Sequence, residues 1–321
     1  MSASDAGTGL ASVRPQSRAQ VAARGWALAG AMCVAAQLAL LVRWVADEGY
    51  RLTGSRPAAT TTALVLQGVF TALVVITLAV LVGWVWRQSR AEGRLSFDAA
   101  AVIGLLLSTW LDPVQDYARP VFVQNLQALT PAGSFGPYLP GWQGEAAHTV
   151  SWLWLPLLPM YGAFYAAIVL ISNLIRRAGT HRPHLSTARL YGLGYLISYL
   201  TVALLTQIYP LLAVGIWGHA IPQLTLFAGH WYQWPLYEAP VTALVVLLPA
   251  ILRHQHLTRG QSVVERGLEQ LAPRRQSWVR LLAVTAWMNG AVLLYMLVQI
   301  LLSLVPGSGP DSLPAHFTTT P

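Results

Sequence analysis

The sequence predicts an all-α integral membrane protein, a polytopic bundle of about seven transmembrane helices. Hydrophobic residues make up 55% of the 321 residues, charged residues only 10%, and the mean hydropathy is +0.50. An ordinary soluble domain has a much more polar composition. Seven apolar segments approach the length that crosses a hydrocarbon core of about 30 Å. They lie near Trp26–Val45, Thr61–Trp86, Phe97–Leu111, Trp152–Ile175, Leu190–Val214, Tyr237–Leu252 and Val279–Leu304.

The third and sixth segments are short, and each has a carboxylate at one end. Asp112 follows the third segment, and Glu238 lies at the start of the sixth. We therefore expect these two segments to begin or finish in a cavity lined by protein instead of in lipid. The first segment resembles a secretory signal, but Arg43-Trp-Val-Ala-Asp-Glu is a poor cleavage context, so we expect a retained helix.

The arginines predict the orientation. All 20 basic residues are arginines, and 16 of them precede the first segment or lie in the second-to-third, fourth-to-fifth and sixth-to-seventh connections. The positive-inside rule places that side in the cytoplasm, with the N-terminus inside and the C-terminus outside, as in a multi-pass protein of the cell membrane. Because the arginines form short clusters between apolar runs, the net charge of +8 is a topology signal and predicts no nucleic-acid partner.

The predicted organisation is a single transmembrane domain over residues 21–305. Residues 1–20 and 306–321 have the composition of disordered tails. Two outer connections, residues 112–151 and 215–237, are too long for simple turns between helices, and such loops usually have a role.

These two loops bring polar side chains to one face of the membrane. Carboxylates at the end of a transmembrane segment are costly to desolvate, so a function is the default hypothesis for them. Asp116, Asp112 and Glu238 are the candidate catalytic residues. Candidate substrate-binding residues around them are Trp110, Tyr117, Asn125, Trp142, His230, Tyr232, Trp234 and Tyr237. Glu145, His148 and His219 lie on the same predicted face.

Each candidate also has a structural interpretation. Asp112, followed by Pro113 and then Gln115, fits a helix N-cap with proline at the first helical position and a capping-box partner. Glu238 at a helix start complements the helix dipole. Asn125 fits a residue that satisfies loop backbone groups, and His230 one that forms a hydrogen bond at the interface. Trp142, Trp231 and Trp234 fit an interfacial aromatic belt.

No metal or organic cofactor is expected. His181-x-x-His184 and His254-x-His256 lie in arginine-rich inner loops, which disfavour a cation. A retinal Schiff base requires a lysine, and the chain has none. The sequence also has neither a glycine-rich phosphate loop after a strand nor a Gly-x-Ser-x-Gly elbow. The single Cys33 fits a small core residue.

Several stretches resemble the AveC-type spirocyclase family. They are Trp110-Leu-Asp-Pro-Val-Gln-Asp-Tyr, the region around Asn125, Gly133-Ser-Phe, Pro140-Gly-Trp142 and Tyr232-Gln-Trp-Pro-Leu-Tyr-Glu238. The family's namesake acts in avermectin biosynthesis, where it closes a dihydroxy-ketone polyketide into a spiroketal with loss of water. The resemblance implies a membrane-bound cyclase of secondary metabolism that acts on a lipophilic small molecule. It carries over no set of catalytic residues, so the assignments above rest on chemistry.

That chemistry matches the candidate residues. A carboxylic acid in apolar surroundings can drive the loss of water through an oxocarbenium ion, and an ionised carboxylate can accept hydroxyl protons and stabilise the cation. The same groups suit a protonation-initiated cyclase of a terpenoid, which is one alternative. A seven-helix transporter or sensor is the other, although Gln207, Asn173 and Asn289 are few for a polar path across a bilayer.

Overall fold

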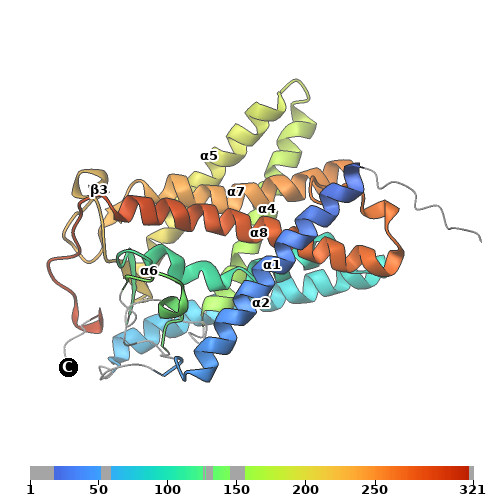
Figure 1. Ribbon diagram of the computed structural model, residues 1–321. Helices are drawn as coiled ribbons and strands as arrows, with labels where there is room; N and C mark the ends of the chain where they lie inside the picture. The colour runs from blue at the N-terminus through green and yellow to red at the C-terminus, as the bar shows by residue number, and fades with distance from the viewer. Residues whose placement is uncertain (1–17, 52–58, 126, 128–132, 145–155, 318–321) are drawn as a thin grey trace, which may run out of the picture.

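The computed structural model describes residues 18–51, 59–125, 127, 133–144 and 156–317. Six helices in it are long and apolar enough to cross a membrane, and a bent pair of shorter helices makes a seventh possible span. The structure is therefore a bundle of long apolar helices, consistent with the polytopic membrane protein that the composition predicts (Figure 1). The long helices are α1 (Arg18–Ala46), α2 (Thr61–Glu92), α4 (Leu157–His181), α5 (Thr187–Thr206), α7 (Glu238–Arg259) and α8 (Pro273–Ser303), and the bent pair is α3 (Phe97–Leu106) with η1 (Thr109–Asp116).

The bend between α3 and η1 is the main difference from the predicted spans. The two helices meet at 40°, and η1 is a 3-10 helix. The hydroxyls of Ser108 and Thr109 donate to the carbonyls of Leu105 and Leu106, at 2.7 and 2.9 Å. Pro113 has no N–H to continue an α-helical ladder. These features account for the bend and for the change to a 3-10 helix. The helix continues beyond Leu111, where the apolar segment ends, so Asp112 and Asp116 lie on η1.

The two ends of the bundle carry different segments. The strand end comprises residues 117–125, 133–144, 212–237 and 305–317. The arginine end comprises residues 87–96, 176–189 and 253–280, which hold most of the described arginines. Helix α1 begins at the arginine end, whereas α8 finishes at the strand end (Figure 1).

Close helix contacts position α8 in the centre of the bundle. A Cβ atom at Gly30 of α1 would lie 1.9 Å from the backbone oxygen of Leu282, so only glycine fits there. A Cβ atom at Gly104 of α3 would lie 3.1 Å from the Cα of Thr285. Small residues allow backbones to approach in this way in membrane bundles. Helices α1 and α3 thus pack against two faces of α8 through their glycines.

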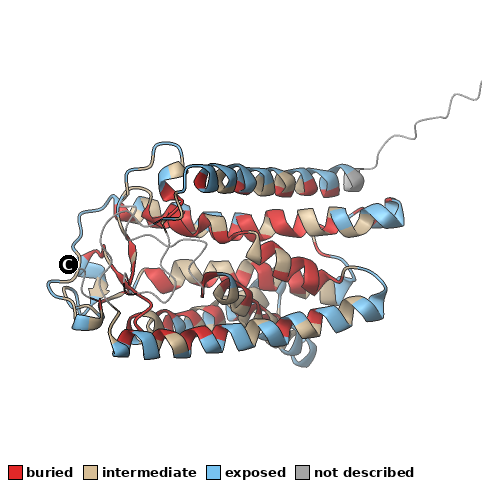
Figure 2. Cartoon of the chain, turned by 90° about the horizontal axis from the view of Figure 1, so that it is seen from below, coloured by how far each residue is buried: buried red, intermediate tan, exposed pale blue. Residues whose placement is uncertain are grey.

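The core lies between the helices, and apolar side chains also cover the outside. Buried residues gather where the helices face one another, while exposed residues lie on the outward sides (Figure 2). Many of the exposed residues are large and apolar, including Val80, Leu204 and Leu301. A water-facing surface rarely shows contiguous apolar patches of this kind. The outward sides thus have the character expected of helices that face lipid.

Two small antiparallel sheets lie at the strand end. Strand β1 (Phe122–Gln124) pairs with β2 (Gly215–Trp217), with Phe122 opposite Trp217. Strand β3 (Thr225–Leu226) pairs with β4 (Trp234–Pro235). The sheets join the two loops that the sequence analysis placed on one face. Short elements complete this end: α6 (Ile208–Leu211), η2 (Gly136–Tyr138), η4 (Pro222–Leu224) and η6 (Ala315–Phe317), whereas η5 (Leu268–Gln270) lies at the arginine end.

The C-terminal segment packs against this end as far as Phe317, in contrast to the disordered tail expected from its composition. Ser308 forms an isolated β-bridge with Ala220, and the N–H of Asp311 donates to the carbonyl of Gly229 at 2.7 Å. Phe317 is buried. The backbone of this proline- and glycine-rich segment thus pairs with the neighbouring loop. The expected N-terminal tail lies outside the described residues up to residue 17, and α1 already begins at Arg18.

Candidate functional site

A cavity lies inside the bundle near the strand end. Helices α3, η1, α4, α5, α7 and α8 form its walls, and the β1–β2 sheet covers one side. The space not filled by protein atoms, with the mouth included, is about 940 Å³. It is lined by Leu105, Asp112, Gln115, Phe122, Met160, Tyr161, Phe164, Ala167, Val202, Leu205, Thr206, Tyr209, Val214, Trp217, Glu238, Thr242, Val245, Val246, Val292, Tyr295 and Met296.

Asp112 reaches the cavity from η1. Its side chain is buried, and its Oδ1 accepts a hydrogen bond from the hydroxyl of Tyr161 on α4 at 2.8 Å. Its Oδ2 has no hydrogen-bond partner among the described residues. The interpretation of Asp112 as a helix N-cap is wrong, because η1 begins at Thr109 and continues through Asp112 to Asp116. Asp112 therefore presents one unpaired carboxyl oxygen within an apolar chamber.

Glu238 enters the same cavity as the first residue of α7. The hydroxyls of Thr242 and Tyr295 donate to its Oε1 at 2.5 and 2.7 Å. The side-chain amide of Gln299 forms a short hydrogen bond with Oε2. Both carboxyl oxygens are thus paired with neutral groups, and the carboxyl also lies at the positive end of the α7 dipole. The donors and the dipole favour the ionised form of Glu238, whereas burial away from water favours the neutral form.

Two hydrogen bonds fix η1 against α8. The indole N–H of Trp110 donates to Oδ1 of Asn289 at 2.8 Å. The Tyr295 hydroxyl, which holds Glu238, also lies 3.5 Å from Oε1 of Gln115 on η1. The predicted substrate-binding residue Trp110 therefore acts on the cavity indirectly, by positioning the helix that carries Asp112.

Asp116 occupies a different environment from Asp112, although it lies one turn further along the chain. It is fully buried, and its Oδ1 accepts hydrogen bonds from the backbone N–H groups of Val121 and Phe122, at 2.7 and 3.0 Å. These bonds close the turn that leads into β1. Its Oδ2 has no partner among the described residues, and Asp116 is not one of those that line the cavity. Asp116 thus positions Phe122, which does line it.

Aromatic rings close the strand side of the cavity. Phe122 packs edge-on against Trp217, with ring centroids 5.4 Å apart, and against Tyr209 at 5.7 Å. The β1–β2 pairing holds Phe122 and Trp217 together. The rings form a rigid apolar cover over the chamber that contains the two carboxyl groups.

Asn125 satisfies loop backbone groups, as its structural interpretation expected. Its side-chain amide donates to the carbonyls of Ala213 and His316, at 2.9 and 2.8 Å, and its Oδ1 accepts from the N–H of Gln127 at 3.0 Å. Asn125 thereby fastens the C-terminal segment to the loop that follows α6. It is not among the described residues that line the cavity.

The predicted aromatic residues of the two loops lie near one another in pairs but outside the cavity lining. Tyr117 donates to the carbonyl of Pro140 at 2.5 Å and packs edge-on against Trp142. His230 stacks on Tyr232, with centroids 5.1 Å apart. Trp234 belongs to β4, and the Tyr237 hydroxyl accepts from the N–H of Ile221 at 3.4 Å. Glu145 and His148 lie outside the described residues, and His219 bonds to the carbonyl of Val305.

The polar residues that sequence reasoning missed lie on the membrane helices themselves. Tyr161, Thr242, Tyr295 and Gln299 hold the two carboxyl groups. A signal was available for some of them. Thr242 follows Glu238 by four residues and Gln299 follows Tyr295 by four, and residues four apart share one face of a helix. Polar pairs on one face of an apolar span indicate a buried site.

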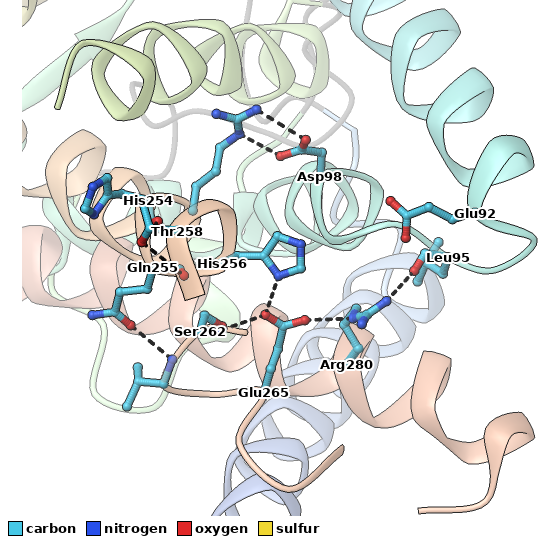
Figure 3. Close-up of polar contacts among 12 residues, drawn as sticks. Glu92, Leu95, Asp98, His254, Gln255, His256, Thr258, Ser262, Glu265 and Arg280 are labelled. Atoms are coloured by element: carbon cyan, nitrogen blue, oxygen red, sulfur yellow. Dashed lines mark hydrogen bonds and ion pairs between the residues drawn. The ribbon is translucent and has the colours of Figure 1, made fainter. Parts of the chain in front are cut away.

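A second group of buried charges lies at the arginine end (Figure 3). Nε of Arg253 lies 2.7 Å from Oδ1 of Asp98, which also accepts from the Tyr165 hydroxyl. Glu265 pairs with Nε of Arg280 and with Nδ1 of His256, both at 2.8 Å. Here every buried carboxylate has a cationic partner. In the cavity, by contrast, no Arg or His is among the described lining residues.

The cavity is suited to proton transfer to an uncharged, lipophilic molecule. Asp112 offers an unpaired oxygen that can carry a proton, and Glu238 offers a second carboxyl group held by neutral donors. A cation formed between them would be stabilised at short range in a low-dielectric chamber. The apolar walls exclude water that would otherwise capture such a cation.

Comparison with known proteins assigns the chain to a family. A family model described as "Spirocyclase AveC-like" matches residues 92–321, which is most of the chain and includes every residue that lines the cavity. Searches of curated proteins and of solved structures return no match. The resemblance seen in the sequence is thereby confirmed, and this chain belongs to the AveC-like spirocyclase family, a family of enzymes.

Proposed function

We propose that this enzyme closes a lipophilic dihydroxy-ketone polyketide into a spiroketal with loss of water, using Asp112 and Glu238. Family membership supports the reaction class. The single observation that carries the residue assignment is that both carboxyl groups line one cavity, away from any described cationic side chain. Asp116, the third candidate catalytic residue, is held by the backbone of the turn into β1 and does not line the cavity, which favours Asp112 as the acid.

The reaction balances without a cofactor. One substrate hydroxyl adds to the ketone carbon, and its proton reaches the ketone oxygen, which gives a hemiketal. Protonated Asp112 gives its proton to the hemiketal hydroxyl, the carbon–oxygen bond breaks, and water leaves an oxocarbenium ion. The second hydroxyl then attacks this cation and loses its proton to the Asp112 carboxylate, which regenerates the acid. Ionised Glu238 stabilises the cation throughout.

Matched asparagine variants test this assignment. In Asp112→Asn the amide cannot give a proton, so turnover of a synthetic long-chain dihydroxy ketone should fall by about 10²–10⁴-fold, the usual contribution of a general acid. Asp116→Asn keeps an oxygen for the N–H groups of Val121 and Phe122 and should remain active. Chiral chromatography of the product separates enzymatic closure from spontaneous closure. Full activity with one stereoisomer in Asp112→Asn, with loss in Asp116→Asn, would return the acid to Asp116.

We also propose that the arginine end faces the cytoplasm and the strand end the outside, in the cell membrane. The arginine distribution supports this orientation. Reporter fusions after Arg94 and Arg177 should then report cytoplasm, and fusions at Gly133 and His230 should report the outside. A cytoplasmic signal at Gly133 or His230 would reverse the orientation.

A further inference from the structure

Helix α5 covers the cavity, so a molecule that enters from the side of the bundle has to pass along this helix. At the arginine end α4 and α7 touch directly, because NH1 of Arg253 on α7 donates to Ser172 and Asn173 on α4, at 2.8 and 3.1 Å. Towards the strand end the cavity lies between these two helices, with side chains from both on its walls. Helix α5 is therefore the element that separates this part of the cavity from the outer surface of the bundle.

Among the described residues, hydrogen bonds join α5 to α7 but not to α4 near the strand end. On the α7 side, the Tyr195 hydroxyl donates to the carbonyl of Pro240 at 3.0 Å, and a Cβ atom at Gly194 would lie 3.2 Å from the Leu247 side chain. Within the part of the chain that the structure describes, no hydrogen bond joins α4 to α5 near the strand end.

The α4 side of α5 is where lining residues reach the surface. Met160 and Phe164 of α4 are half-buried, and Leu205 of α5 is 37% exposed although it lines the cavity. We propose that a lipophilic ligand passes between the membrane and the cavity through a side opening between α4 and α5, framed by Met160, Phe164 and Leu205. The proposal deepens the proposed function, since it takes the cavity as the substrate site and states how that site is reached.

The surroundings of this opening are those of a lipid-facing surface. The neighbouring side chains of Leu158 and Leu204 are exposed, Leu204 by 72%. Phe164 lies seven residues after the start of α4 at Leu157, which is a depth of about 10 Å at 1.5 Å per residue. Leu205 lies six residues before the span ends at Leu211, or about 9 Å. Both positions fall within the hydrocarbon region of a membrane that the spans cross.

The inner walls favour a ligand with one oxygenated part and one long apolar part. Ala167, Val202 and Val245 line the cavity with apolar groups. Asp112 and Glu238 supply the polar contacts elsewhere on its wall. A molecule whose oxygen atoms lie at the two carboxyl groups can extend its hydrocarbon part along α4 and α5 to the opening. The substrate class is thus one that partitions into the membrane before it binds.

Photolabelling of the protein in lipid vesicles tests the opening without use of turnover. The probe is a long-chain alcohol that carries a diazirine at the hydroxyl end, dissolved in the bilayer of phosphatidylcholine vesicles. Peptide mass spectrometry should find adducts on the cavity segments that contain Thr242 and Tyr295. A bulky ring in the frame, Leu205→Trp, should reduce the initial rate at which these adducts form about tenfold, which corresponds to about 1.4 kcal/mol on the barrier to entry. The matched control Leu204→Trp places the same ring on the neighbouring lipid-facing position and should leave them unchanged.

Three results would overturn the proposal. They are equal cavity labelling in Leu205→Trp and Leu204→Trp, absence of cavity adducts in the unaltered protein, and stronger labelling by a short water-soluble diazirine alcohol than by the long-chain probe. Phe164→Trp, on the other side of the opening, keeps the test valid if Leu205→Trp fails to fold, and it should reduce the labelling in the same way. If labelling follows the proposal while Asp112→Asn keeps full activity, the opening stands and the assigned chemistry fails, so the two proposals are separable.

Discussion

Both ends of the bundle bury carboxyl groups, but they surround them with different partners. At the arginine end Asp98 pairs with Arg253, and Glu265 pairs with Arg280 and His256. In the cavity Asp112 and Glu238 receive hydrogen bonds only from hydroxyl and amide groups. A buried ion pair is fixed in its charge state by its partner, whereas a carboxyl group among neutral donors can exchange a proton. Cationic partners thus separate the buried carboxylates of the arginine end from Asp112 and Glu238, the pair proposed to react.

Helix α4 contacts a carboxyl group of each kind through two tyrosines that lie four residues apart. Tyr161 donates to Asp112 in the cavity, and Tyr165, four residues later, donates to Asp98 at the arginine-end cluster. The two tyrosines lie on the same face and make the same kind of bond. Arg253 lies beside Asp98, whereas no described cation lies beside Asp112, so the proposed function gives the two bonds different roles.

The largest expected effect is on turnover, when a carboxyl group of the cavity is changed. In Glu238→Gln the amide keeps the size of the side chain but cannot be an anion, so turnover should fall by about 10²–10⁴-fold through lost stabilisation of the cation. The protein should remain folded in the membrane, as judged by its elution in gel filtration after extraction with detergent. The matched control is Glu269→Gln, which makes the same change at an exposed position of the arginine end. A Glu238→Gln enzyme as active as this control would remove Glu238 from the mechanism.

The next effect is on stability at the arginine end. Arg253→Met leaves the Asp98 carboxylate buried without its cation, which typically costs about 3–5 kcal/mol. Thermal unfolding in detergent should show a large loss for Arg253→Met and a much smaller one for the double variant Asp98→Leu with Arg253→Met. Equal losses in the single and double variants would show that the pair is not coupled.

Removing the hydroxyl of either α4 tyrosine should have a smaller effect, on turnover in one case and on stability in the other. Tyr161→Phe removes the donor to Asp112 and should lower turnover by about tenfold, the effect of about 1.4 kcal/mol on the barrier. Tyr165→Phe removes a donor to a charged group and should cost about 1.5–3 kcal/mol of stability, with turnover retained. Turnover and unfolding temperature measured on both variants check this. The comparison fails if both variants lose stability alone.

The smallest expected effect concerns pH. Burial raises the pKa of Glu265, but the hydrogen bond and charge of His256, the Ser262 N–H and the charge of Arg280 together bring this pKa below its ordinary value. The stabilising contribution is therefore complete above the unfolded pKa of about 4.3 and is lost as the pH falls through the lower folded pKa. Unfolding temperatures of the unaltered protein and Glu265→Gln should differ at about pH 6 and converge towards about pH 3. A constant difference over that range would contradict the assignment.

Some of the site was readable from the sequence because a carboxylate in an apolar segment is conspicuous. Asp112 and Glu238 stand at the ends of two short spans, and both line the cavity. Asp116 looked equally conspicuous, and only the three-dimensional turn shows that two backbone N–H groups hold it. Tyr161 and Tyr295 gave no clear signal, because a tyrosine in an apolar span is common and the face it occupies depends on helix packing.

The fold too was predictable from the sequence where it depends on local properties. Hydropathy predicted the six long helices, since length and apolar character are local properties. The bend before η1 and the packing of the C-terminal segment were not predicted. The bend depends on Ser108 and Thr109 bonding back to the helix, and the packing depends on a loop nearly ninety residues earlier, where Ser308 meets Ala220.

The helical turn after the bend also has a consequence for the order in which the chain is synthesised. It carries Asp112 and Asp116 near the end of the segment Phe97–Asp116, and a buried carboxyl group in a membrane needs polar partners. The polar partners of this segment come later in synthesis, Tyr161 on α4 and Asn289 on α8. The third span thus obtains these polar contacts only once α4 and α8 have been translated.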